Sequence, residues 1–282
     1  MTDSTIQFAA SSAATKPRNR PLAAKNFLLL CVWILSFPFM YHAYTHGMSF
    51  ILDPNVGVSP FDSPLPYFAL LMMATHMVMG AAMNCLAPLQ IHLGISNKTN
   101  GKLHRWVGVA VLLIAIFGAT AGSLYFTLYQ ISVFEGKPHQ TYSTYQAGAM
   151  YGVVMFYVIY KSIQSLVQKN YRVHREWAIR LFMLAVGSWI ARIMRGWLVW
   201  FFAAGEVTGN PVTIPVEFLV MLYAWSFYVL PLAAYEIYLW GKRRKVADKM
   251  PSYFPFGLSL ACVLFLTIGT AGYLLDMFYL NA

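Results

Sequence analysis

The chain has 282 residues, of which 59% are hydrophobic and only 11% are charged, with 20 Lys and Arg against 10 Asp and Glu. Soluble domains carry roughly 45–50% apolar and about 25% charged residues, so this composition predicts a membrane protein and excludes a disordered chain. Three scattered cysteines, Cys31, Cys85 and Cys262, exclude a disulfide scaffold and a cysteine-rich zinc site.

The first 24 residues are polar and rich in Ser, Thr and Ala, which predicts a disordered cytoplasmic tail over residues 1–24. A bilayer core requires about 20 mostly apolar residues per helix. Seven apolar blocks of this kind follow, and we expect them to form one transmembrane domain over residues 25–282. The blocks cover residues 25–46, 66–91, 103–130, 144–168, 174–204, 215–241 and 254–280.

The basic residues alternate between the two sides of these blocks. If the tail is inside, the inner segments hold nearly all Lys and Arg, and Lys137 is the only basic residue of the outer loops. Cytoplasmic loops of membrane proteins carry this excess. The pattern predicts an all-α, polytopic seven-helix bundle with the N-terminus inside and the C-terminus outside. The net charge of +10 is therefore an orientation signal, not a patch for nucleic acid.

Ionisable residues within the apolar blocks are the candidates for a functional site. A charge at the centre of a membrane helix costs about 2.5–3.5 kcal/mol and is usually turned toward the bundle interior. The fifth block contains Arg180, Arg192 and Arg195. Arg180 also has a local explanation, because Glu176 lies four residues earlier and can pair with it. Gly118 and Gly122 in the third block indicate close helix packing.

Helical rise, about 1.5 Å per residue, places the histidines at two depths. His104 and His174 lie at the inner level, with His92 as a further candidate, and His76 and His42 lie at the outer level. Two imidazoles at one depth on different helices are what axial haem ligation requires, and two levels would give electrons a path across the bilayer. We therefore expect haem b as the cofactor and no other metal.

Arginines near these histidines suit haem propionates or another anion, because the guanidinium group matches a carboxylate. The candidate contacts are Arg105, Arg175, Arg180 and Arg192.

Three motifs occur together in this chain. They are the run from His76 through Gly80 to Pro88 and Gln90, the pentapeptide His104-Arg105-Trp106-Val107-Gly108, and the heptapeptide from His174 to Arg180. Together they resemble a family of bacterial multi-pass membrane proteins known as domain of unknown function 2306, over residues 66–195. Ala178 and Val109 depart from the family pattern. The resemblance implies a bacterial inner-membrane location and a site shared by His76, His104, His174, Arg105, Arg175, Arg180 and Arg192, without implying a reaction.

Several functions remain open at this point. The first is electron transfer through haem, with a quinone or a membrane redox protein as the partner. The second is transport or binding of a small anion or an acidic lipid by the arginines, with His76 relaying protons. The third is a non-catalytic assembly subunit in which polar side chains hold the helices together. An enzyme acting on lipid or quinone, with Glu236 and the histidines as acid–base groups, is a further alternative.

Overall fold

The computed structural model of the chain describes residues 20–52, 67–95, 101–132, 139–207, 216–244 and 254–275. Nearly all of these residues are helical and none of them lies in a strand. Most of the predicted tail, residues 1–19, lies outside the described residues. The elements are α1 (Arg20–Leu52), α2 (Tyr67–Ile95), α3 (Gly101–Gly118), the π-helix η1 (Ala119–Phe126), α4 (Thr127–Ser132), α5 (His139–Val167), α6 (Tyr171–Ala185), α7 (Gly187–Val207), α8 (Val216–Arg243) and α9 (Phe254–Leu275).

The described helices have the length and the surface of membrane spans. Five continuous helical segments are long and apolar enough to cross a bilayer, and the α6–α7 pair makes a sixth if it counts as one span. Large apolar side chains point outward from them, for example Phe37, which is 63% exposed, and Trp106, which is 74% exposed. Such extensive exposed apolar surface is typical of contact with lipid. The prediction of a multi-pass helical membrane protein is therefore confirmed in this coarse form.

The sixth predicted span, residues 215–241, corresponds to α8 and is not among the described helices that are apolar enough to cross a bilayer. Its two glutamates, Glu217 and Glu236, and its several Tyr and Trp residues lower its mean hydropathy. Seven spans and their orientation consequently remain predictions.

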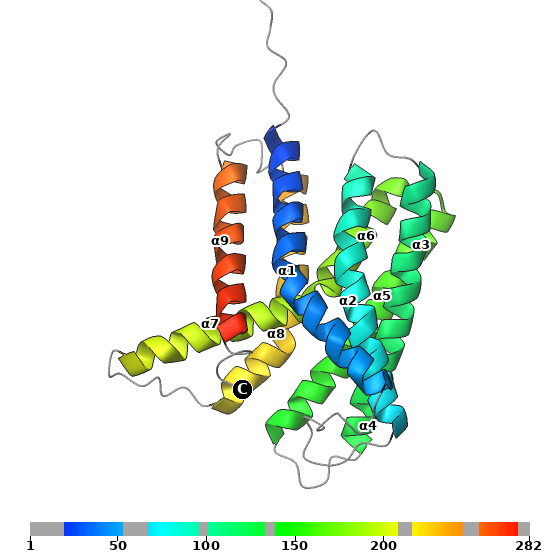
Figure 1. Ribbon diagram of the computed structural model, residues 1–282. Coiled ribbons are helices and arrows are strands. Elements are labelled where there is room, and N and C mark those ends of the chain that lie inside the picture. Colours follow the sequence, from blue (N-terminus) through cyan, green and yellow to red (C-terminus); the bar gives the residue numbers. More distant parts are fainter. Residues whose placement is uncertain are drawn as a thin grey trace, which may run out of the picture.

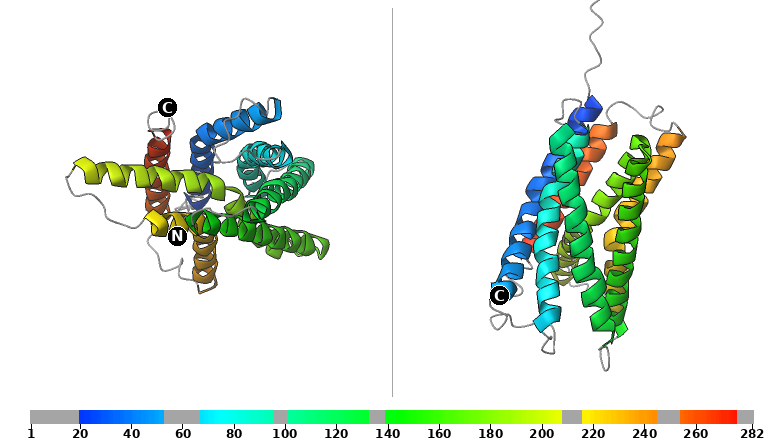
Figure 2. Two further views of the ribbon diagram at one scale, coloured as in Figure 1. Left: turned by 90° about the horizontal axis from the view of Figure 1, so that it is seen from below. Right: turned by 90° about the vertical axis from the view of Figure 1, so that its right-hand side faces the viewer.

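The helices pack into two adjoining groups. Helices α2, α3, α5, α6 and α8 share a core that includes Met83, Val111, Met155, Leu184 and Tyr228. A second core joins α1, α2 and α7. Helix α9 packs along α1 and α7, and Figure 1 shows it beside α1, on the side of the molecule away from α3 and α5. Figure 2 shows the elongated bundle that results.

The fifth predicted block is not one straight helix. Helix α6 ends at Ala185, and α7 begins at Gly187 with its axis turned by 45°. The backbone at Val186 (φ −81°, ψ −2°) departs from ideal helical values. Residues expected on one helical face are therefore divided between two helices of different direction, with His174 on α6 and Arg192 on α7.

The third predicted block is continuous but changes its helical type. The α-helical turn of α3 gives way to π-helical geometry at Ala119, and α-helical geometry returns at Thr127. Short π-helical stretches within membrane or soluble helices frequently accompany functional sites. In this chain the change begins next to Gly118, whose carbonyl contacts a histidine of α2.

Candidate functional site

Two cavities, both partly open to the surface, are lined by most of the predicted site residues. The first, which we name the His76 cavity, has a volume of about 390 Å³ and is lined by side chains that include His42, His76 and Arg192. The second, the His104 cavity, has a volume of about 260 Å³ and lies between α2, α3, α5 and α6. His104, His174 and Arg105 line it. The single shared site that the motifs implied is therefore divided between two cavities.

A tight turn between α5 and α6 positions His174. Lys169 ends the preceding helix with a positive φ of 56°, as C-terminal capping residues often do. Asn170 then caps α6, its side-chain oxygen accepting from the Val173 backbone N–H at 3.3 Å. His174 consequently lies in the first turn of α6 and faces back toward α5. Its Nδ1 is 3.0 Å from the carbonyl oxygen of Ser162.

The Ser162 carbonyl contact favours one tautomer of His174, because it is shorter than the 3.4 Å contact between Nδ1 and the Ser162 hydroxyl. A carbonyl oxygen only accepts hydrogen bonds, so Nδ1 must carry the proton and donate it to Ser162. In a neutral imidazole, Nε2 then holds the lone pair. A backbone bond of this kind orients metal-binding histidines in many proteins. His174 is therefore arranged so that Nε2 can act as a ligand or as a hydrogen-bond acceptor.

Two polar atoms in the His104 cavity lack partners among the described residues. They are Nδ1 of His104 and Oε1 of Gln90, both buried. Gly108 leaves space for the Gln90 amide, because a Cβ at this glycine would lie 2.8 Å from Gln90 Nε2. Buried polar groups without hydrogen bonds are costly and are rare in native proteins. Together with His174, they make this cavity a candidate ligand site.

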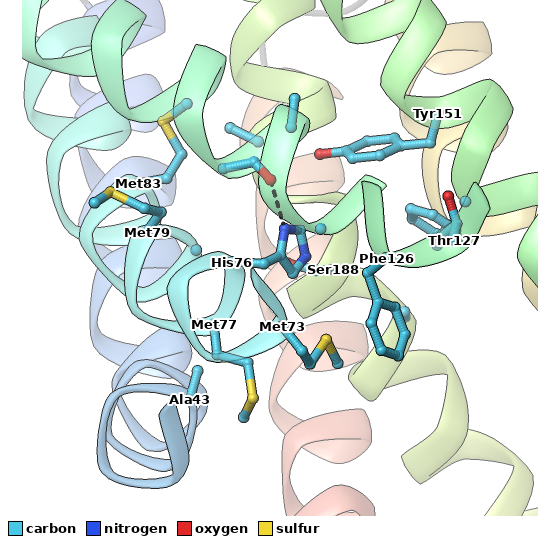
Figure 3. A pocket seen from close by; sticks show the side chains of 18 of the residues that line it. Ala43, Met73, His76, Met77, Met79, Met83, Phe126, Thr127, Tyr151 and Ser188 are labelled. Atoms are coloured by element: carbon cyan, nitrogen blue, oxygen red, sulfur yellow. Dashed lines mark hydrogen bonds between the residues drawn. The ribbon is translucent and has the colours of Figure 1, made fainter. Parts of the chain in front are cut away.

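The His76 cavity is organised around the π-helical segment. His76 Nδ1 lies 2.8 Å from the Gly118 carbonyl oxygen and donates to it, which leaves the lone pair on Nε2. A Cβ at Gly122 would overlap the ring of His76, so this glycine is needed for the ring to fit. Figure 3 shows the ring of His76 directed into the cavity, with Tyr151 and Thr127 across from it. Of the two glycines predicted to permit close helix packing, Gly122 therefore makes room for the His76 ring and Gly118 accepts its hydrogen bond.

Arg192 brings a positive charge to the same cavity. Its Nη1 donates to the Ser188 carbonyl oxygen at 3.3 Å, and its guanidinium group lies 5.2 Å from the Phe39 ring centroid. Among the described residues that line the cavity, none is Asp or Glu. His42 also lines it, and its ring lies 3.9 Å from that of His46. The outer-level histidines His42 and His76 therefore meet in one cavity together with Arg192.

The other candidate arginines lie elsewhere. Arg180 Nε donates to Glu236 at 2.6 Å, so its partner is on α8 rather than the local Glu176. Its guanidinium group also lies 4.4 Å from the Trp177 ring centroid. Arg175 is exposed and lines neither cavity. The geometry indicates that Arg180 holds α6 against α8.

Ser162, which lines the His104 cavity, was not predicted from the sequence, and Ser188 was placed on one helical face with Arg192 without a role. Ser162 and Ser188 supply the backbone acceptors for His174 and Arg192. A serine in an apolar helix carries no signal of such a role, because it is equally common as a packing residue. Gln90 had a clear signal, since it closes the first of the three motifs.

Comparison of the chain with protein families, with characterised proteins and with solved structures finds no match. The resemblance to domain of unknown function 2306 therefore stays an expectation, and the functional assignment depends on the two cavities.

Proposed function

We propose that the protein is a membrane electron-transfer protein that would hold a b-type haem at the His104 cavity, with the imidazoles of His104 and His174 binding its iron. The cavity, at about 260 Å³, would widen between α2, α3, α5 and α6 to admit the haem ring. The observation that carries the proposal is that these two imidazoles, from α3 and α6, line one largely apolar cavity. Haem held by two histidines supplies one-electron transfer without an open coordination position for substrate.

The residues of this cavity each have a role in the proposal. The Ser162 carbonyl fixes His174 with Nε2 available for ligation. Nδ1 of His104 is buried and has no hydrogen-bond partner among the described residues. A group bound in the cavity would supply the missing partner. Arg105 is exposed and lines the cavity, and its guanidinium group would pair with a propionate there.

We assign haem only to this cavity. In the His76 cavity the His42 ring lies against His46, and Arg192 faces the same space without a carboxylate among the described lining residues. These features favour a different ligand, although His42 and His76 were expected as a second axial pair.

We further propose that α8 also spans the membrane, that α6 and α7 together form one bent span, and that the chain crosses a bacterial inner membrane seven times with its N-terminus inside. The distribution of Lys and Arg supports this orientation. The His104 cavity then lies toward the cytoplasm and the His76 cavity toward the outside.

A visible spectrum and an iron analysis of the purified full-length chain test the proposal. The protein should be produced in cells supplied with a haem precursor. We expect sharp reduced-minus-oxidised bands and close to one haem per chain in a pyridine haemochrome assay. Colourless, iron-free protein that is folded and monodisperse would contradict the proposal and would favour the ligand-binding or assembly alternatives.

A further inference from the structure

The walls of the His76 cavity are mostly apolar, with His76 and Arg192 among its polar lining residues. Its volume is about 390 Å³, within the range of roughly 300–1,000 Å³ that is typical of small-molecule sites. Phe39, Phe126 and Phe227 contribute aromatic rings, and Met73 and Met77 contribute thioethers. Aromatic and thioether groups both make favourable contacts with a flat ring. The walls therefore suit a planar, lipid-soluble molecule.

The histidine supplies a hydrogen-bond acceptor. Because His76 Nδ1 donates to the Gly118 carbonyl at 2.8 Å, Nε2 carries the lone pair of the neutral ring. The ring lines the cavity, and Figure 3 shows it among the other labelled lining side chains. A ligand next to this nitrogen is stabilised if it offers an N–H or O–H donor.

The arginine supplies a donor. Arg192 contacts the Ser188 carbonyl oxygen and the Phe39 ring, and no carboxylate among the described residues pairs with it. Guanidinium has five N–H groups, so one hydrogen bond leaves most of its donors available. A cation in an apolar bundle is costly and usually marks a ligand or an ion path.

These two groups restrict the ligand. A cation is disfavoured by Arg192. A simple anion is disfavoured by the lone pair of His76 Nε2, and a plain acyl chain would leave both polar groups without partners. A flat ring that carries a hydroxyl donor and an oxygen acceptor satisfies both groups, and a quinol is such a ring.

We propose that the His76 cavity binds the headgroup of a membrane quinol, with His76 Nε2 accepting from a ring hydroxyl and Arg192 donating to a ring oxygen. The site is built by residues outside the His104 cavity. Its occupancy therefore does not depend on whether that cavity holds haem.

Calorimetric titration of the full-length chain in detergent micelles tests the proposal, with a benzoquinol bearing one isoprenoid unit as the probe under anaerobic conditions. We expect His76→Gln and Arg192→Gln each to weaken binding by about tenfold or more, because each removes a hydrogen bond to the ligand. His46→Gln on α1 and Arg195→Gln on α7 are matched controls, since both native side chains are exposed and neither lines the cavity.

A second variant keeps the test informative if the polar substitutions disturb folding. Gly80 lines the cavity, and a Cβ there meets no atom within 4 Å. Gly80→Leu should therefore fold normally and abolish quinol binding by filling the cavity, whereas Gly80→Ala should retain binding.

Three results would overturn the proposal. The first is wild-type protein that does not bind the quinol, and the second is binding that is unchanged in His76→Gln, Arg192→Gln and Gly80→Leu. The third is Arg192-dependent binding of dodecanoate with no binding of the quinol, which would identify an anion site instead. Haem content plays no part in any of these readouts, so this proposal and the haem proposal fail separately.

Discussion

The ring of His76 occupies the space that any side chain at position 122 would need. A Cβ at Gly122 would overlap ring atoms of His76, whereas a Cβ at Gly80, in the wall of the same cavity, meets nothing within 4 Å. Gly122→Ala should displace the ring from the Gly118 carbonyl and destabilise the protein by about 1–3 kcal/mol, as overpacking does.

Thermal unfolding of the two alanine variants in detergent measures this difference. The Gly122→Ala variant should unfold at a lower temperature and lose quinol binding, while Gly80→Ala should match the wild type in both. Equal unfolding temperatures for the two variants would show that position 122 does not constrain His76.

At the scale of residues, the sequence predicted which histidines lie together better than it predicted the ion-pair partner of an arginine. Counting helical rise grouped His104 with His174 and His42 with His76, and the structure brings together the same pairs. The partner of Arg180 was not predictable, because Glu236 lies 56 residues away and reaches it only through the packing of α6 on α8. Local spacing suggested Glu176, which instead lies 3.8 Å from Arg243.

At the scale of elements, hydropathy located the helices but not their irregularities. The segment η1 (ATAGSLYF) and the Gly187-Ser188 pair after Val186 contain small and polar residues. Such residues are common in regular membrane helices, so they do not by themselves predict a bend or a change of helical type. Both features arise from backbone geometry that periodicity does not record. The bend matters because it places Arg192 and His174 in different cavities. The π-helical segment matters because it begins next to Gly118, whose carbonyl oxygen accepts from His76.

Glycines determine how closely α7 and α9 approach. A Cβ at Gly196 on α7 would overlap the Gly269 carbonyl oxygen and lie 2.5 Å from the Tyr273 backbone nitrogen on α9. Trp197 and Trp200 donate from Nε1 to the carbonyl oxygens of Phe265 and Ile268 at 3.1 and 3.0 Å. Small residues permit such close contact in membranes, where packing rather than water drives helix association.

We therefore expect Gly196→Ala to separate these two helices and to lower stability by about 1–3 kcal/mol. Gly257→Ala is the control, because a Cβ at this position of α9 meets open space. Reversible unfolding in mixed micelles compares the two variants. Wild-type stability in Gly196→Ala would show that α9 does not depend on this contact.

At the scale of the whole molecule, the sequence was sufficient to predict a helical membrane protein, because long apolar blocks are enough for that conclusion. The exposed apolar surface of the described helices agrees with it. The number of spans is harder to determine. Helix α8 is polar for a span and the α6–α7 pair is bent, so length and hydropathy count five or six spans among the described residues. The seven-span topology depends on the positive-inside pattern.

Reporter fusions in a bacterial host test this topology. A fluorescent protein that folds only in the cytoplasm should fluoresce when fused after Arg244 and stay dark when fused after Leu275, and alkaline phosphatase should show the opposite pattern. Fluorescence after Leu275 would mean an even number of spans and would contradict the C-out orientation.

The central claim is that His104 and His174 hold one haem between them. The most direct measurement is haem stoichiometry in His104→Ala and His174→Ala, with His92→Ala as the control, because His92 is exposed on α2 and lines neither cavity. We predict that each of the first two variants loses the low-spin spectrum and most of its haem while His92→Ala keeps one haem per chain. Full haem content with an unchanged spectrum in either cavity variant would contradict the claim.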